Sequence, residues 1–219
     1  MGGPARRRAG RRQGLTRPDP LLLDAFVVAA QERGLFGEKK VTAPDLFRLV
    51  RDMPYRRPSD GRPGTLVEEW CGTCSGKHVL LQQLLYEIGV SSRLMIATYR
   101  YSWQAAGAPP PELAAILDAG PVPDVHNFLE VQGDAGWLPV DATWPETAKE
   151  LGFAFNQALV PGVAHQIACV PPYHAWPVPA GVQLPAYKER IVRGHCGPDL
   201  RRREAFIEAI AAWISARLG

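Results

Sequence analysis

The feature that most constrains this sequence is a cysteine-bearing stretch that runs directly into an apolar series with helical spacing. The stretch reads EEWCGTCSGKH over residues 68–78, and VLLQQLLYEIG follows over residues 79–89. Gly89 is a natural C-terminal stop for a helix. The spacing predicts a largely buried helix over residues 75–88, opening just after Cys74. Its apolar side consists of Val79, Leu80, Leu81, Leu84, Leu85 and Ile88.

The other segments predict a mixture of helices and strands. Periodicity and capping predict helices over about 21–32 and from 42 to just before Pro54, and a short one near 112–117. Composition predicts a loop over 55–64 and a strand over 93–101. Repeated prolines predict a loop-rich flap over about 160–187 that lies on the core. A last amphipathic helix is expected over 200–218, with these residues facing inward: Phe206, Ile207, Ile210, Trp213, Ile214 and Leu218.

Residues 126–131 and 136–141 have the alternation of an antiparallel hairpin. If residues 132–135 form a four-residue loop, Val131 pairs with Gly136. Counting back along both strands then sets position 126 opposite position 141. Directly opposed residues share a face, with Cβ atoms about 4.5–5.5 Å apart. We therefore expect the hairpin to bring His126 beside Asp141.

The chain's length and composition favour one domain with a core of its own. At 219 residues, with 46% hydrophobic and 21% charged residues, it can bury a core without help from disulfides or metals. We expect a single domain over 19–219, with its core at about 65–145. Residues 1–18 hold six arginines and no acid, and removing them turns the formal charge of +3 negative. They predict a disordered arm that is dispensable and solvated rather than a specific nucleic-acid reader.

Targeting signals are absent from the sequence as it stands. No continuous apolar region with a small-residue cleavage site follows the arginine pairs. The segment LLLDAFVVAA is interrupted by Asp24 and is too short to cross a bilayer. We therefore expect a cytoplasmic protein that does not insert into membranes. In that compartment, four cysteines indicate thiol or metal chemistry rather than a disulfide scaffold.

Two chemistries compete with a reactive thiol at this stretch. A structural zinc site needs a second close pair of ligands beside Cys71 and Cys74, but Cys169 is alone and His195 and Cys196 are adjacent. A redox pair needs a strand before Cys71. Residues 65–70 could serve as that strand, yet no thioredoxin-like βαβ pattern follows. We expect neither a metal nor another cofactor.

A nucleophile fits the stretch better. A thiol in the first turn of a helix experiences the positive end of the helix dipole, which favours the thiolate. Cys74 fits this position better than Cys71, and the free N–H groups nearby suit an oxyanion. The nucleophile also needs a base and a group that orients the base. His126 and Asp141 are the candidates, ahead of His78, whose place on the same helical face suits a base poorly.

These stretches resemble the transglutaminase-like superfamily of papain-type cysteine enzymes. The matching segments are GTCSGKHVLLQQLLYEIGVSSR around Cys74, HNFLEV at His126 and VDATWP at Asp141. The resemblance implies an α+β fold, with a helical lobe whose central helix carries the nucleophile, packed on an antiparallel sheet. It also implies a Cys-His-Asp triad that acts on carbonyls through an acyl-enzyme and requires no metal.

The expected function is therefore cysteine-dependent hydrolysis or acyl transfer. A peptide, an amide or a thioester are all admissible substrates, and the sequence leaves open whether water or an amine accepts the acyl group. Trp70, Tyr173 and Trp176 are candidate substrate-binding residues, with a packing role as the alternative for each. Cys71 is expected to be a buried bystander that could trap Cys74 as a disulfide. The rival function is a non-catalytic protein-binding module with the same fold.

Overall fold

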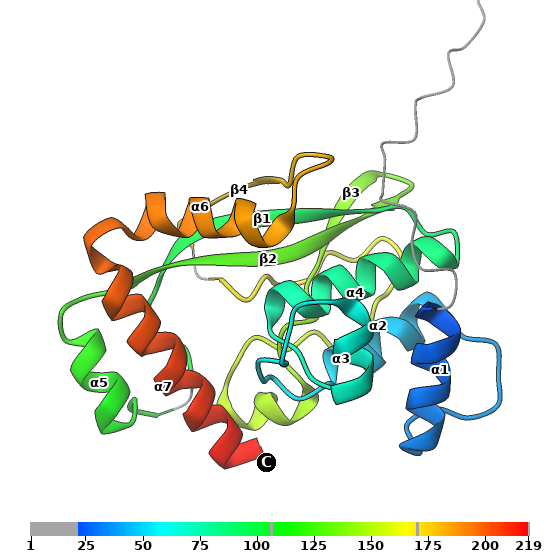
Figure 1. Ribbon diagram of the computed structural model, residues 1–219, viewed down its shortest axis with the longest axis horizontal. Coiled ribbons are helices and arrows are strands. Elements are labelled where there is room, and N and C mark those ends of the chain that lie inside the picture. The colour runs from blue at the N-terminus through cyan, green and yellow to red at the C-terminus, as the bar shows by residue number, and fades with distance from the viewer. Residues whose placement is uncertain (1–21, 106, 170, 219) are drawn as a thin grey trace, which may run out of the picture.

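The computed structural model has the α+β architecture expected from the sequence (Figure 1). It describes residues 22–105, 107–169 and 171–218, so the predicted arm over 1–18 lies outside the described residues. The predicted single domain over 19–219 stays a prediction.

The helices are α1 (Leu22–Glu32), α2 (Ala43–Arg51), α3 (Pro63–Glu69), α4 (Cys74–Glu87), α5 (Pro111–Leu117), α6 (Leu184–Cys196) and α7 (Leu200–Leu218), with short 3₁₀ turns at Glu146–Leu151 and Gly197–Asp199. The strands are β1 (Ser92–Tyr101), β2 (Val122–Gly133), β3 (Gly136–Val140) and β4 (Tyr173–Pro177).

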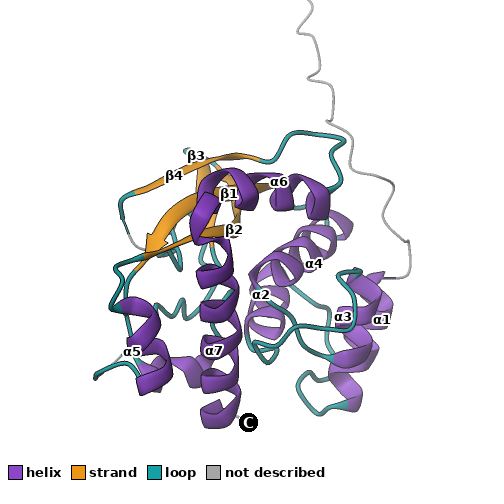
Figure 2. Cartoon of the chain, turned by 60° about the vertical axis from the view of Figure 1, so that its left-hand side comes forward, coloured by secondary structure: helices purple, strands orange, loops and turns teal. Residues whose placement is uncertain are grey.

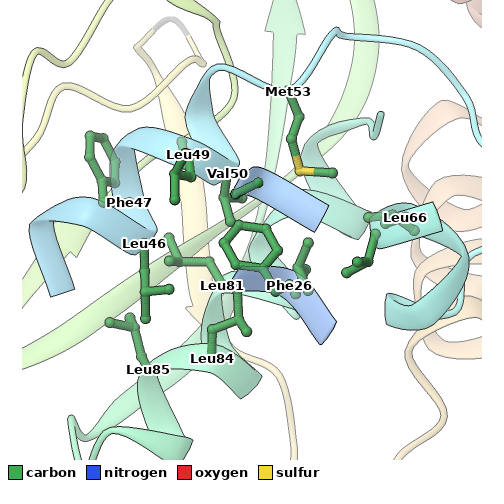
Figure 3. Close-up of a cluster of buried hydrophobic side chains, with 14 of the residues drawn as sticks. Phe26, Leu46, Phe47, Leu49, Val50, Met53, Leu66, Leu81, Leu84 and Leu85 are labelled. Atoms are coloured by element: carbon green, nitrogen blue, oxygen red, sulfur yellow. The ribbon is translucent and has the colours of Figure 1, made fainter. Parts of the chain in front are cut away.

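Helices α1 to α4 form a lobe with its own apolar core, seen on the right of Figure 1. Its second helix starts at a capping box, in which Thr42 accepts from the backbone of Asp45 and the Asp45 carboxylate accepts from the backbone of Thr42. Figure 3 shows how side chains from α1, α2 and α3 meet the buried side of α4. The packed residues include Phe26, Leu46, Phe47, Leu49, Val50, Met53, Leu66, Leu81, Leu84 and Leu85.

The four strands form one antiparallel sheet in the order β3-β2-β1-β4. The predicted hairpin register is wrong by two residues, because Val131 pairs with Leu138 and Gly133 pairs with Gly136. The chain turns on two residues instead of four, and this adds two further ladder pairs. Side chains alternate faces with a period of two, so an even shift keeps residues 126 and 141 on one face.

The predicted flap over 160–187 is more regular than its prolines suggested. Residues 173–177 are β4, which pairs with the outer edge of β1, and α6 begins at Leu184. Pro177 ends an edge strand, and Pro185 lies in the first turn of α6, where its missing N–H costs no helical hydrogen bond. The prolines therefore mark the ends of elements instead of excluding them.

Helix α6 lies close to the sheet and leads into α7, which runs down beside α5 (Figure 2). The predicted last helix is confirmed, and Phe206, Ile210 and Ile214 are buried against the sheet. Ile207 and Trp213 are partly buried in the same cluster. The side chain of Leu218 lies outside the described residues. No helix within the described ranges is long and apolar enough to cross a membrane.

Candidate functional site

The site forms where the N-terminus of α4 meets a stretch of β2 that β3 does not cover. Strand β3 pairs with β2 only between Leu129 and Gly133. The earlier part of β2 is therefore not paired with β3, and the backbone N–H of Asn127 lies near the sulfur of Cys74 and helps to lower its pKa. Cys74 is the first residue of α4 and is partly exposed. Because β3 is short, the thiol at the start of α4 can lie against the unpaired stretch of β2.

His126 and Asp141 are paired next to this thiol. The distance from His126 Nε2 to Asp141 Oδ2 is 2.8 Å, and both side chains are buried. The Asp141 carboxylate also accepts from the backbone N–H of Thr143 at 2.9 Å and of Ala168 at 2.8 Å. Burial opposes the charge on Asp141, but His126 and these N–H groups hold the pKa of the carboxyl well below its usual range. The carboxylate is therefore ionised and fixed in orientation.

The Cys74 thiol and the His126 imidazole also interact, and each shifts the pKa of the other. Since Nε2 of His126 faces Asp141, Nδ1 is the nitrogen left for the sulfur. Burial favours the neutral thiol, but Lys188, His126 and the Asn127 N–H outweigh it and lower the pKa of Cys74 to about 6. Burial also opposes the charge on His126, yet Asp141 and the thiolate raise the pKa of the imidazole to about 10. At neutral pH the pair is a thiolate and an imidazolium.

Lys188 approaches the thiol from the opposite side. It lies on α6, and its Nζ is 3.8 Å from Cys74 Sγ and 2.7 Å from the hydroxyl of Ser75. The Ser75 hydroxyl donates in turn to the Asn127 amide at 2.9 Å. Lys188 was not identified from the sequence, because it lies just beyond the predicted flap in a stretch with no predicted element, and its contact joins residues 114 positions apart.

His78 is a support for the site and has no free nitrogen to act as its base. Its Nδ1 donates to the carbonyl of Cys74 at 2.7 Å, and its Nε2 accepts from the N–H of Ala142 at 2.9 Å. Burial dominates its titration and lowers the pKa of His78 to about 4, so the ring is neutral. His78 therefore connects the first turn of α4 to the residue that follows Asp141.

Two more buried side chains hold the segment that carries Asp141. The ammonium of Lys77 donates to the carbonyls of Arg51 at 2.8 Å and Thr143 at 3.1 Å, and burial lowers the pKa of Lys77 to about 7. His165 accepts from the N–H of Asp141 at 3.3 Å. The sequence carried no signal for these roles, because each depends on contacts between distant segments.

Tyr55 reaches the site from the segment between α2 and α3. Its ring packs against Trp144 with centroids 4.7 Å apart, and its hydroxyl lies close enough to Cys74 for the Cys74 backbone and thiol to affect its pKa. Burial, reinforced by the negative charges of Cys74 and Asp124, raises the pKa of Tyr55 well above its usual value. The phenol therefore stays protonated beside the nucleophile. In the sequence, Tyr55 begins a polar loop and gave no sign of this position.

A cavity of about 580 Å³ opens beside the first turn of α4. One wall is the loop at 57–61, the other is α6 with the start of α7, and Thr73, Ser75, Gly76 and Val79 lie between them. The charged residues that line it are Arg57, Asp60, Lys188, Glu189, Arg193, Arg203 and Glu204. Cys74 and His126 are not among the lining residues, but Thr73, Ser75 and Lys188 bring the cavity next to the thiol on its α6 side.

Trp70, Tyr173 and Trp176 do not line this cavity. Trp70 is 8% exposed and stacks on Phe26 in the helical core, with ring centroids 5.2 Å apart. Tyr173 and Trp176 lie on β4, which is separated from the open edge of β2 by β1. The Trp176 indole donates to the Tyr187 hydroxyl at 2.9 Å. The structure therefore assigns packing contacts to Trp70 and Trp176, whereas Tyr173 is largely exposed.

The other cysteines differ from Cys74 in burial and charge. Cys71, Cys169 and Cys196 are buried free thiols. Burial raises the pKa of Cys169 to about 12 and that of Cys196 to about 11. The strand that a redox pair would need before Cys71 is instead helix α3. Within the described residues, no group of three or more His, Cys, Asp or Glu side chains is arranged to hold a metal ion.

Comparison with protein families agrees with this geometry. Residues 40–142 match the model of the transglutaminase-like superfamily, whose members are generally cysteine enzymes. The match includes Cys74, His126 and Asp141. A comparison with curated proteins gave no match. With this match and the α+β fold around it, residues 40–142 of the chain carry a region that matches the transglutaminase-like superfamily.

Proposed function

We propose that this protein is a cysteine enzyme that hydrolyses or transfers an acyl group through a covalent intermediate on Cys74. The observation that carries the proposal is the series from Cys74 through His126 to Asp141, in which His126 and Cys74 shift each other's pKa and 2.8 Å separates the last two side chains. In this series the nucleophile, the proton carrier and the orienting carboxylate are in contact before substrate binds. Peptides, other amides and thioesters all have a carbonyl suited to it.

In the first step, the Cys74 thiolate attacks the carbonyl carbon and forms a C–S bond. The carbonyl electrons move onto oxygen and return as the bond to the leaving group breaks. The His126 imidazolium gives its proton to the departing amine or thiolate, which leaves a thioester and a neutral imidazole. In the second step, water or an amine attacks the thioester while His126 takes its proton, and the thiolate–imidazolium pair is restored.

The developing oxyanion has two donors nearby. The backbone N–H of Cys74 lies at the start of α4, where it has no partner within the helix. The protonated Tyr55 hydroxyl lies near this same N–H. We assign both groups to the oxyanion, with the substrate oxygen taking the place between them. Asp141 keeps Nδ1 of His126 directed at the sulfur throughout.

Alkylation with iodoacetamide, followed residue by residue with mass spectrometry, tests this assignment. Cys74 is expected to react with a midpoint near pH 6 and to react faster than the buried Cys71, Cys169 and Cys196. Replacing His126 with alanine removes the cation beside the sulfur, so the midpoint should move up toward the ordinary thiol range of about 8.5. Equal labelling of all four cysteines would instead favour the protein-binding module.

A second experiment identifies the acyl group. Incubation with a library of peptide, amide and thioester substrates, followed by acid quench, should add the mass of an acyl group to Cys74. The matched control is Cys74→Ser, which keeps the size of the side chain and should acquire no adduct. Release of a free acid or of an amine conjugate from the adduct distinguishes hydrolysis from transfer.

A further inference from the structure

Lys188 is the charged group on the cavity side of the thiol, and its surroundings indicate what it recognises. Its ammonium lies 3.8 Å from Cys74 Sγ and 2.7 Å from the Ser75 hydroxyl, and it lines the cavity. Building on the proposed function, we propose that Lys188 makes this site selective for acyl substrates that carry a carboxylate close to the reacting carbonyl. The sequence analysis and the family match assign no role to this residue.

The charges around the cavity leave Lys188 as an available cation. Arg193 pairs with Glu189 at 2.6 Å on the same helix. Arg203 pairs with Asp124 at 2.7 Å, and Asp60 pairs with Arg62 at 2.7 Å. Among the described residues, no carboxylate lies within ion-pair distance of Lys188. The anion that faces its ammonium in the resting site is the Cys74 thiolate.

Acylation removes that anion. When Cys74 becomes a thioester, the sulfur loses its charge and the partly buried ammonium of Lys188 loses its counter-charge. An uncompensated cation in a partly buried site is unfavourable. A substrate carboxylate beside Lys188 supplies a new partner as the sulfur charge disappears, so it stabilises the transition state more than the resting site.

Distances limit where this carboxylate lies in the substrate. The sulfur attacks from about 3–3.5 Å, and an ammonium–carboxylate bond is about 2.7–2.9 Å long. With 3.8 Å between Nζ and Sγ, a carboxylate a few bonds from the carbonyl carbon can satisfy both contacts. The free C-terminus of the residue that leaves is one such group. A carboxylate on the acyl side, as in a succinyl group, is the other.

The selectivity can be measured without knowing the substrate. Iodoacetate and iodoacetamide both form an S–CH₂ bond as the thiolate displaces iodide, and they differ in carrying a carboxylate or a neutral amide. At one pH both reagents react with the same fraction of thiolate. The ratio of their rate constants at Cys74 therefore cancels any change in the pKa of the thiol and reports charge recognition alone.

We expect the iodoacetate-to-iodoacetamide ratio to fall about tenfold in Lys188→Met, in keeping with one close charge pair. It should fall further in Lys188→Glu and be largely retained in Lys188→Arg. The matched control is Arg190→Met, which removes the same charge from the same helix at a residue that does not line the cavity. Its ratio should stay within about twofold of the wild type, because an exposed charge outside the cavity is screened by solvent and salt.

Matched substrates then locate the carboxylate. One arm compares peptides that end in a free carboxylate with the same peptides as C-terminal amides, and the other compares succinyl with butyryl thioesters. If the carboxylate belongs to the leaving residue, the wild type should prefer the peptides with a free C-terminus by about tenfold, and if it belongs to the acyl group, the succinyl thioester. In either case Lys188→Met should lose the preference.

The failure of this inference is distinct from failure of the proposed function. If Cys74 reacts at low pH but the reagent ratio is the same in wild type, Lys188→Met and Lys188→Glu, the carboxylate selectivity is wrong and the enzyme proposal stands. If Cys74 reacts like an ordinary thiol and acquires no acyl group, both are wrong. An equal fall in Arg190→Met would assign the effect to the general charge of α6 and would also overturn the selectivity.

Discussion

The two sides of Cys74 differ in what they supply to the sulfur. On the sheet side, His126 and Asp141 are buried, and the imidazole can give and take a proton. On the α6 side, Lys188 is partly exposed and presents a charge beside the cavity. Both sides lower the pKa of the thiol. In the proposed mechanism, moving the proton therefore belongs to the sheet side alone, whereas stabilising the thiolate is shared between the sheet and the solvent-facing helix α6.

Replacement of Asp141 with asparagine should have the largest effect on turnover, because it removes the charge that orients His126 and leaves Lys188 unchanged. Asparagine keeps the shape but loses the charge that holds His126 protonated and oriented. Turnover of any substrate that acylates Cys74 should fall by about 10³–10⁴-fold, as for triads in general. Steady-state rates of wild type and variant measure the loss. A loss below about tenfold would show that the sheet side does not carry the proton.

Tyr55→Phe should have the next largest effect. It removes the hydroxyl beside the Cys74 N–H while keeping the ring on Trp144. Loss of one oxyanion donor lowers kcat by about 10²–10³-fold, with little change in KM. The alkylation midpoint of Cys74 should stay within about half a pH unit, since alkylation forms no oxyanion. A rise in KM with kcat unchanged would assign Tyr55 to ground-state binding.

Lys188→Met sharpens the comparison by weakening only the α6 side. The charge of Lys188 is the largest single contribution that lowers the pKa of Cys74. Its removal should move the lower edge of the alkylation profile above about 6, toward the usual thiol value. The upper edge of the acylation profile, set by the imidazolium at about 10, should persist because Asp141 remains in place. A pH series of alkylation rates measures the lower edge, and a pH series of acylation rates measures the upper edge.

The proposed roles of Cys74 and His126 predict that the wild-type enzyme acylates fastest within a limited pH range. Below the Cys74 pKa of about 6 the sulfur gains a proton and becomes unreactive. Above the His126 pKa of about 10 the imidazolium loses the proton that the leaving group needs. Acylation should therefore be fastest between these values.

Tyr173→Ala is expected to have the smallest effect. Tyr173 lies on β4, on the far side of β1 from the open edge of β2, and does not line the cavity. Cys74 reactivity and turnover should stay within about twofold of the wild type, as for most exposed substitutions. A clear rise in KM would restore Tyr173 as a substrate-binding residue.

The sequence predicted the parts of this molecule that depend on local pattern. The apolar spacing after Cys74 indicated a buried helix, and α4 occupies residues 74–87. The alternation around His126 indicated the hairpin. Its predicted register was off by two residues, yet His126 still faces Asp141, because a shift of two keeps side chains on the same face.

The parts that the sequence did not reveal depend on tertiary contacts or on proline at element ends. Helix α6 and strand β4 were hidden because prolines argue against regular structure unless their place within an element is known. Lys188, Tyr55 and His165 have no local motif, and their roles follow from which segments the fold brings together. His78 was visible in the sequence, but its supporting role requires knowing that Ala142 lies against it.

Strand β3 is short and leaves part of the β2 edge unpaired, and this links the reactivity of Cys74 to self-association of the protein. An open strand edge invites pairing with another chain, and here the first turn of α4 lies against the uncovered stretch of β2. Substitutions that loosen the contact between α4 and β2 would slow alkylation of Cys74. They would also expose the unpaired backbone N–H and C=O groups of β2 to other chains. Loss of chemistry and onset of self-association should therefore appear together in such variants.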